Sequence, residues 1–214
     1  LSTTQLSALS TTNLSALDQT QFNQLSTTQV KALTTTQIAG LNATDISEMS
    51  NVQLQALTTA QVSALTSTNA AALADTQVAA LSVTQLGRLT NAVLHAFETT
   101  QLASLAATQM QAFSTSQIAA LDATDLDELS TTQVASLTST QVKAITTTVI
   151  GGISAAAFGA FDTTQLSQLA TTQLDQLSTT NLSALTSTQL GAFTSTQVAS
   201  FDDAQLEAYL LGIA

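Results

Sequence analysis

The chain has no cysteine and no proline, three basic residues, and no long apolar run. The absence of cysteine excludes disulfides and thiolate metal sites. Fourteen acidic residues give a formal charge of −11, which repels phosphate backbones, so we expect no nucleic-acid partner. No apolar run approaches the roughly 20 residues needed to cross a bilayer, so we expect no membrane insertion. Because the chain begins in mid-pattern, we also expect it to be a segment of a longer protein.

What the sequence does contain is an eight-residue repeat written mainly in Leu, Ala, Ser, Thr and Gln. Cutting from Leu1 gives 26 complete octads and the remainder YLLGIA, with no insertion. Position 1 is always a large apolar residue, and position 6 nearly always is, with Ala70 as the small exception. Such regularity is typical of stacked units that cannot bury their apolar faces alone. We therefore predict one continuous array over residues 1–214.

The period of eight excludes a single regular element. In one long α-helix an octad advances roughly 800°, so position 1 would drift by about 80° per repeat. In one long strand, positions 1 and 6 have opposite parity and would point to opposite faces. The chain must therefore turn within every octad.

The first five positions of the octad indicate where a helix begins. Ser2-Thr3-Thr4-Gln5 has the form of a capping box, with the N-cap at position 2 and a glutamine at N3. Positions 1 and 6 then stand at N′ and N4, where they form a hydrophobic staple. The fold class predicted is all-α, a solenoid or superhelix of short capped helices, one per octad. We expect positions 1 and 6 to be buried throughout.

Residues 33–38, LTTTQI, and 137–142, LTSTQV, carry the pattern most clearly. They resemble the Thr/Gln-rich L-[ST]-[ST]-T-Q-[VLI]-x-A octads that recur in large secreted or surface proteins of bacteria, including adhesin-like ones. The resemblance covers the whole chain. It implies an extended, repetitive protein exposed outside the cell or on its surface.

The sequence offers little catalytic chemistry. The single histidine, His95, has no cysteine or second histidine to complete a metal or nucleophilic site, so we expect an exposed polar residue, no cofactor and no enzyme. Two octads concentrate acidic residues. Calcium is possible there but less favoured than a solvated acidic face at helix N-termini, because neither octad has the spacing of a calcium loop. These residues are Asp45 and Glu48 in one octad, and Asp122, Asp125, Asp127 and Glu128 in the other.

Two successive octads, residues 145–160, depart from the pattern. They lose the polar residue at position 5 and gain glycines, which permit close approach of another backbone. We consider either neutral drift or a covered surface, formed by another turn of the chain, a second chain or another subunit. The candidate packing or assembly residues are Val149, Ile150, Gly151, Gly152, Ala157, Phe158 and Gly159.

These features favour a structural repeat segment that serves as a scaffold or a self-associating filament. Two alternatives remain. One is a Thr-rich β-solenoid with an ice-binding or adhesive surface, although seven glycines and no proline are few for its many corners. The other is a solenoid that binds a protein partner, although the surface positions lack aromatic and Arg anchors.

Overall fold

The computed structural model describes residues 1–214 and contains helices but no strands, so the all-α solenoid is confirmed and the Thr-rich β-solenoid is wrong. The chain divides into two compact units, residues 1–112 and 113–214. The helices of unit 1 are α1 (Thr3–Ser7), α2 (Thr11–Leu14), α3 (Gln19–Asn23), α4 (Thr27–Ala32), α5 (Thr35–Ala39), α6 (Ala43–Glu48), α7 (Asn51–Ala56), α8 (Thr59–Ser63), α9 (Ser67–Ala71), α10 (Asp75–Ala79), α11 (Val83–Leu86), α12 (Asn91–Leu94), α13 (Thr99–Ala103) and α14 (Ala107–Met110). Those of unit 2 are α15 (Thr115–Ile118), α16 (Ala123–Glu128), α17 (Thr131–Ser136), α18 (Ser139–Ala144), α19 (Thr147–Gly152), α20 (Ala155–Phe158), α21 (Thr163–Gln168), α22 (Thr171–Leu174), α23 (Thr179–Ser183), α24 (Ser187–Leu190), α25 (Ser195–Val198) and α26 (Asp203–Ile213).

Each octad forms one helix, and in most octads the predicted capping box starts it. The N-cap side chains of α10, α13, α14 and α22 accept no bond from an amide, and in α2, α12, α19, α20 and α23 the residue at position 5 does not return the bond. In α8, Thr58 is the N-cap, and its Oγ1 accepts from the amide of Gln61 at 3.2 Å. The side chain of Gln61 returns the bond, since its Oε1 accepts from the amide of Thr58 at 2.8 Å. Two amides that a helix start leaves without intrahelical partners are thereby satisfied. Helices begin at position 3, one residue after the cap, and all except α26 end between positions 6 and 8.

Apart from α26, the helix of an octad does not run into the next one, because the residue at position 1 has extended rather than helical backbone dihedral angles. Leu57, for example, has φ −57° and ψ 133°. A small residue at position 8 lets a neighbouring turn come close. At Gly40, an added Cβ would lie 2.6 Å from the side chain of Thr11, so glycine permits α5 to pack on α2.

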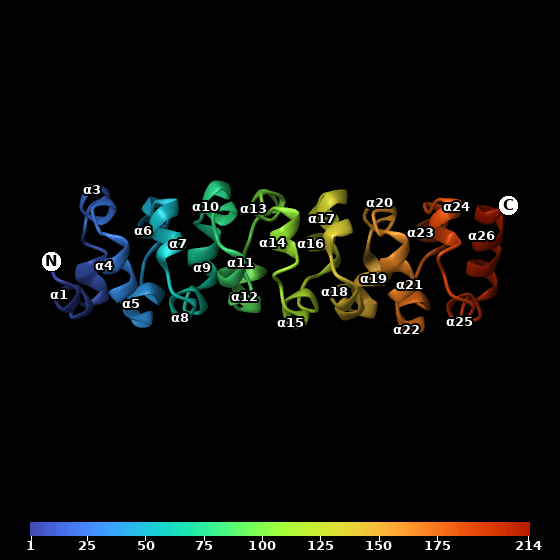
Figure 1. The fold of residues 1–214 in the computed structure, drawn as a ribbon, viewed down its shortest axis with the longest axis horizontal. Coiled ribbons are helices and arrows are strands. Elements are labelled where there is room, and N and C mark those ends of the chain that lie inside the picture. Colours follow the sequence, from blue (N-terminus) through green and yellow to red (C-terminus); the bar gives the residue numbers. More distant parts are fainter. The chain divides into compact units, whose positions relative to one another are not determined.

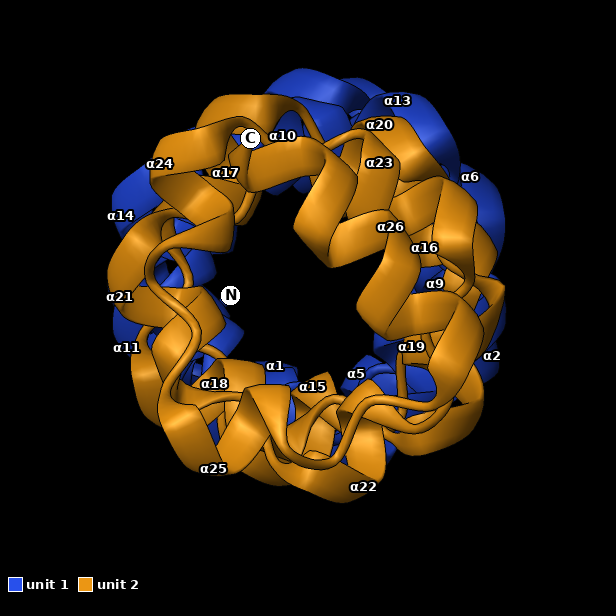
Figure 2. Cartoon of the chain, turned by 90° about the vertical axis from the view of Figure 1, so that its right-hand side faces the viewer, with its two compact units in different colours: residues 1–112 blue, residues 113–214 orange.

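Turns of the solenoid pack one on the next inside each unit. A helix contacts the helix three octads further on, as α1 contacts α4 and α4 contacts α7. In Figure 1, these three helices succeed one another along unit 1. In unit 2, drawn in orange in Figure 2, the helices follow one another around a ring, and the contacting pair α20 and α23 lie in the same sector.

Positions 1 and 6 form the core, as predicted, but not throughout the chain. In the interior, Leu54 at position 6 is fully buried and Leu57 at position 1 is 4% exposed. At the ends the expectation is wrong: Leu1 is 66% exposed and Leu206 is 36% exposed. The physical reason is that each turn is covered by its neighbours, and a terminal turn lacks one of them.

Candidate interaction site: the glutamine ladder and the N-terminal hollow

Position 5 holds a buried amide that bonds to the preceding turn. The side chain of Gln61 is 2% exposed. Its Nε2 donates to the carbonyl of Val30 at 2.8 Å and to the carbonyl of Leu33 at 2.7 Å. Its Oε1 accepts from Thr58 at the same time. Both N–H donors and the carbonyl oxygen of this amide are therefore satisfied in the core.

We call the pair of bonds from one position-5 side chain to the preceding turn a rung, and the series of rungs the glutamine ladder. In most rungs the acceptors are a position-6 carbonyl 31 residues earlier and a position-1 carbonyl 28 residues earlier, so one turn takes between three and four octads. Gln109 and Gln189 keep the position-1 carbonyl but take a position-7 carbonyl 30 residues earlier as the second acceptor. Rungs to the carbonyls 31 and 28 residues earlier occur within unit 1 at Gln37, Gln53, Gln61, Gln77, Gln85 and Gln101, and within unit 2 at Gln165, Gln173, Gln197 and Gln205.

Asparagine at position 5 makes half a rung. Asn69 donates only to Leu41, 28 residues earlier, at 2.8 Å. Asn181 likewise donates only to Ile153, at 3.1 Å. The asparagine side chain is one methylene shorter, so its amide bonds to one of the two carbonyls.

Aspartate at position 5 reverses the polarity of the bond. The buried Asp45 has no N–H to donate, and it accepts from the hydroxyl of Ser15 in the preceding turn at 2.5 Å. It also keeps the capping role, since it accepts from the amide of Asn42 at 3.0 Å. The acidic side chain that we considered for calcium is thus used as a cap and as a contact between turns.

Three octads have no rung because position 5 is apolar. Val93, Val149 and Ala157 are all buried, at 1%, 7% and 6% exposure. For Val149, the carbonyls at the spacing of a rung are those of Ile118 and Leu121, and no side chain of the next turn donates to them. The ladder is therefore interrupted in two successive octads of residues 145–160.

The glycines of residues 145–160 face other turns of the same chain. A Cβ added at Gly151 would lie 3.3 Å from Cβ of Gln176, and one added at Gly152 would lie 3.1 Å from Cβ of Ala123. Ile150 and Phe158 are fully buried. The close approach expected of these glycines thus occurs between turns of unit 2, and a role of the segment in assembly between chains stays a prediction.

The remaining polar residues that we singled out lie at helix ends. His95 is exposed and follows α12 as its C-cap. Asp122 is the N-cap of α16 and accepts from the amide of Asp125 at 2.9 Å. Asp127 accepts from the amide of Ser154 at 2.8 Å. Carboxylates at helix N-termini have the expected favourable position relative to the helix dipole.

The first turn of unit 1 carries position-5 side chains without rungs. Gln5, Asn13 and Gln21 are exposed, and their amide N–H groups donate to no other residue. Gln29 makes half a rung, from Nε2 to the carbonyl of Leu1 at 2.7 Å.

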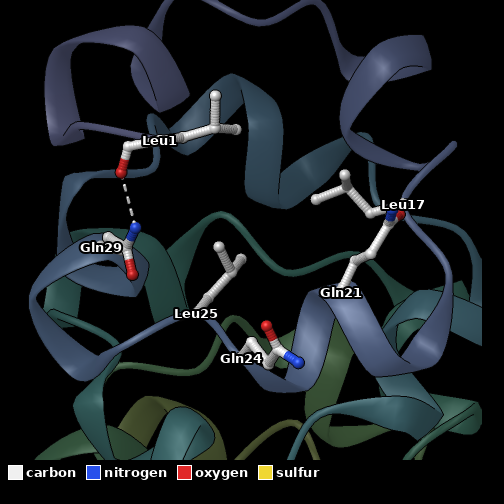
Figure 3. A pocket seen from close by; sticks show the side chains of 6 residues that line it. All are labelled: Leu1, Leu17, Gln21, Gln24, Leu25 and Gln29. Atoms are coloured by element: carbon white, nitrogen blue, oxygen red, sulfur yellow. Dashed lines mark hydrogen bonds between the residues drawn. The ribbon is translucent and has the colours of Figure 1, made fainter.

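Beside Gln21 and Gln29 lies a hollow of about 290 Å³, which we call the N-terminal hollow. Figure 3 shows Leu1 and Leu17 on opposite sides of it. The hollow is lined by Leu1, Leu17, Gln21, Gln24, Leu25 and Gln29.

The C-terminal end of the chain differs, because its last helix is longer than the others. The helix α26 continues through position 1 of the partial octad, where Tyr209 packs its ring 6.5 Å from that of Phe193 and 5.7 Å from that of Phe201. Leu210 and Leu211 on this helix are 53% and 75% exposed. No helix of the chain combines the length and the apolar character that crossing a membrane requires.

These features define an α-solenoid repeat protein whose turns are joined by side-chain amides. A family model described as the ALTTAQ repeat matches residues 118–154, so that stretch is similar to this repeat. The six letters of the description also occur at residues 56–61, where they run from position 8 of one octad to the rung-forming Gln61. No curated protein matches the chain.

Sequence reasoning identified position 5 as a capping residue but missed its bonds to the preceding turn. A capping box accepts Glu as well as Gln at N3. Glu never occurs at position 5 in this chain. The absence of Glu at position 5 could have indicated these bonds, because only a side-chain amide can accept from the N-cap amide and donate to two carbonyls at the same time.

Proposed function

We propose that the chain is a structural segment of a larger repeat protein, which provides a scaffold outside the cell or on its surface and has no catalytic role. The observation that carries this proposal is the glutamine ladder. It joins successive turns through main-chain carbonyls, which every residue possesses, so the same joint is repeated whatever the surface residues are. Such a joint allows length to be added one octad at a time.

The division of labour within the octad supports the same role. Positions 1 and 6 form the core, and position 5 makes the capping bonds and the rungs. Positions 2, 3, 4 and 7 are mostly exposed. The exposed positions carry chiefly Ser, Thr and other small residues, with few of the aromatic or Arg side chains that dominate binding hot spots. Self-association with other copies of the repeat is therefore favoured over a specific unrelated partner.

An extracellular or surface location is supported by the resemblance of residues 33–38 to octads of secreted bacterial proteins. The high Ser and Thr content and the acidic balance are compatible with it. Antibodies raised against the folded chain should label intact cells of the source organism. Labelling that appears only after the cells are permeabilised would contradict a surface location.

The scaffold role is tested by changing the length of the chain within unit 1. Duplicating residues 57–64 adds one whole octad. Each position-5 side chain then still has a position-6 carbonyl 31 residues earlier and a position-1 carbonyl 28 residues earlier, so rungs form across the insertion with new partners. Duplicating residues 57–60 adds half an octad and shifts position 5 away from the carbonyls. We expect the octad insertion to retain one cooperative thermal transition and to increase the radius of gyration in X-ray scattering. Equal loss of structure in both insertions would contradict a modular scaffold.

A further inference from the structure

In residues 145–160, the loss of the polar residue at position 5 also removes one bond of the cap. In interior octads such as that of α8, Oε1 of the position-5 glutamine accepts from the amide of the N-cap residue. The apolar side chains of Val149 and Ala157 cannot accept this bond. The N-cap amides of Thr146 and Ser154 therefore lose it and depend on another partner or on solvent.

The amide of Ser154 has a substitute acceptor in the preceding turn. It donates to Oδ1 of Asp127, 27 residues earlier, at 2.8 Å. Asp127 stands at position 7 of its octad, near the end of α16, and we call its bond to Ser154 the carboxylate link. The link joins α20 to α16 across the turn in an octad that has no rung. One bond thus replaces both the missing capping partner and part of the missing connection between turns.

The amide of Thr146 has no such acceptor. The residue 27 positions before it is Ala119, whose methyl group cannot accept a hydrogen bond. Because the rung at Val149 is missing as well, residues 145–152 make no hydrogen bond to the turn before them. Two successive octads therefore differ, since a carboxylate links one of them to the preceding turn and no hydrogen bond links the other.

Packing alone holds α19 to the preceding turn. In Figure 2, α16 lies between α19 and α20 around the ring of unit 2, and it contacts both. A Cβ added at Gly152 would lie 3.1 Å from Cβ of Ala123, at the start of α16. Gly151 and Gly152 are the last residues of α19, and glycine is the poorest helix former after proline. A close contact without a hydrogen bond lets the two backbones separate at low cost.

We propose that the contact between α16 and α19 is a hinge, which opens before the octads of unit 2 that have complete rungs. The carboxylate link confines the opening to α19, because α20 stays bonded to Asp127. Opening exposes Ile150, which is fully buried in the closed form. The hinge gives the solenoid one place to yield when it is bent or stretched. It is a property of unit 2 alone, so it goes beyond the proposed scaffold function and does not depend on it.

Hydrogen exchange measured by NMR tests the hinge in the unmodified chain. The amides of Ile150 and Leu166 make the same bond, each to the carbonyl of its N-cap residue at 3.0 Å, and both residues are fully buried. The octad of Leu166 has a complete rung at Gln165, and the octad of Ile150 has none. We expect a protection factor about tenfold lower at Ile150 than at Leu166. Equal protection at the two amides would overturn the proposal.

A second carboxylate link should close the hinge. Ala119 is exposed, and Ala119→Asp places a carboxylate 27 residues before the amide of Thr146, at the spacing of the natural link. We expect protection at Ile150 to rise by about threefold to tenfold. The matched control is Ser167→Asp, which adds the same charge at position 7 of an octad in which the amide 27 residues later, that of Thr194, already donates to a glutamine. The control should leave protection at Ile150 unchanged.

Removing the natural link should extend the opening to α20. Asp127→Ala deletes the acceptor, so protection of the amide of Phe158 in α20 should fall by about tenfold. Asp127→Asn keeps an acceptor oxygen and should retain most of that protection. Because Asp127 is exposed, both chains should fold, which far-UV circular dichroism checks. The hinge is refuted if Ala119→Asp leaves exchange at Ile150 as fast as before, or if the two Asp127 variants protect Phe158 equally.

Discussion

The octads with Gln53 and Gln61 and the octads with Val149 and Ala157 form the same local structure but join differently to their neighbours. All four helices have an N-cap side chain that accepts from the amide at N3. The first pair makes two complete rungs, and the second pair makes none. The comparison teaches that capping forms the helix within an octad, whereas the side-chain amide connects one turn to the next.

The largest effect should come from breaking a rung with a buried charge. In Gln61→Glu, the carboxylate keeps its bond to the cap but points at the carbonyls of Val30 and Leu33. We expect a loss of about 3–5 kcal/mol in the free energy of unfolding at neutral pH, measured by urea denaturation. Burial favours the protonated form, which can donate, so the loss should shrink as the pH falls.

The control for this substitution is Gln21→Glu, which makes the same change where no rung exists. Because Gln21 is exposed, its substitution should leave the free energy of unfolding nearly unchanged. Comparable losses in the two variants would show that position 5 contributes through the cap alone.

A smaller loss is expected from breaking the packing of the same octad while leaving its rung intact. Leu57 is 4% exposed, and its replacement by alanine should cost roughly 2–5 kcal/mol, with the lower part of that range favoured if neighbouring turns close the cavity. Thermal unfolding followed by far-UV circular dichroism measures the change. Ser63→Ala is the matched control, since Ser63 is exposed and its hydroxyl bond to Arg88 lies at the surface. A Ser63→Ala loss as large as that of Leu57→Ala would mean that the buried and exposed faces are assigned wrongly.

The smallest effect should come from adding a rung where the ladder is interrupted. Val149→Gln introduces an amide of similar volume opposite the carbonyls of Ile118 and Leu121. Two hydrogen bonds are worth about 0.5–1.5 kcal/mol each, and part of this is offset by the entropy of ordering a longer side chain. We expect a net gain of about 1 kcal/mol, together with slower hydrogen exchange in α19. A destabilised Val149→Gln chain would indicate that residues 145–160 have repacked around the valine and no longer accommodate an amide.

The same octads offer a way to sharpen the role of this segment in assembly. If residues 145–160 form a contact between chains, then Val149→Gln combined with Ala157→Gln should leave the helical spectrum intact and weaken assembly measured by sedimentation velocity. Undiminished assembly would leave these residues with a role in packing between turns of unit 2 alone.

The sequence by itself determined the eight-residue repeat, the positions of the N-cap and N3 residues within it, and the all-α class, because these depend on interactions within eight residues. The bond from Thr58 to Gln61 and back spans three residues, so the pattern of residue types was sufficient to predict it. Burial of positions 1 and 6 followed from periodicity, except at the ends, where the covering turn is absent.

Only the tertiary structure decided how the turns meet. The rung from Gln61 to Val30 and Leu33 joins residues 31 and 28 positions apart, and its acceptors are main-chain carbonyls that carry no sequence signal. The number of octads per turn depends on how neighbouring helices pack, and the octad pattern is the same for any such number.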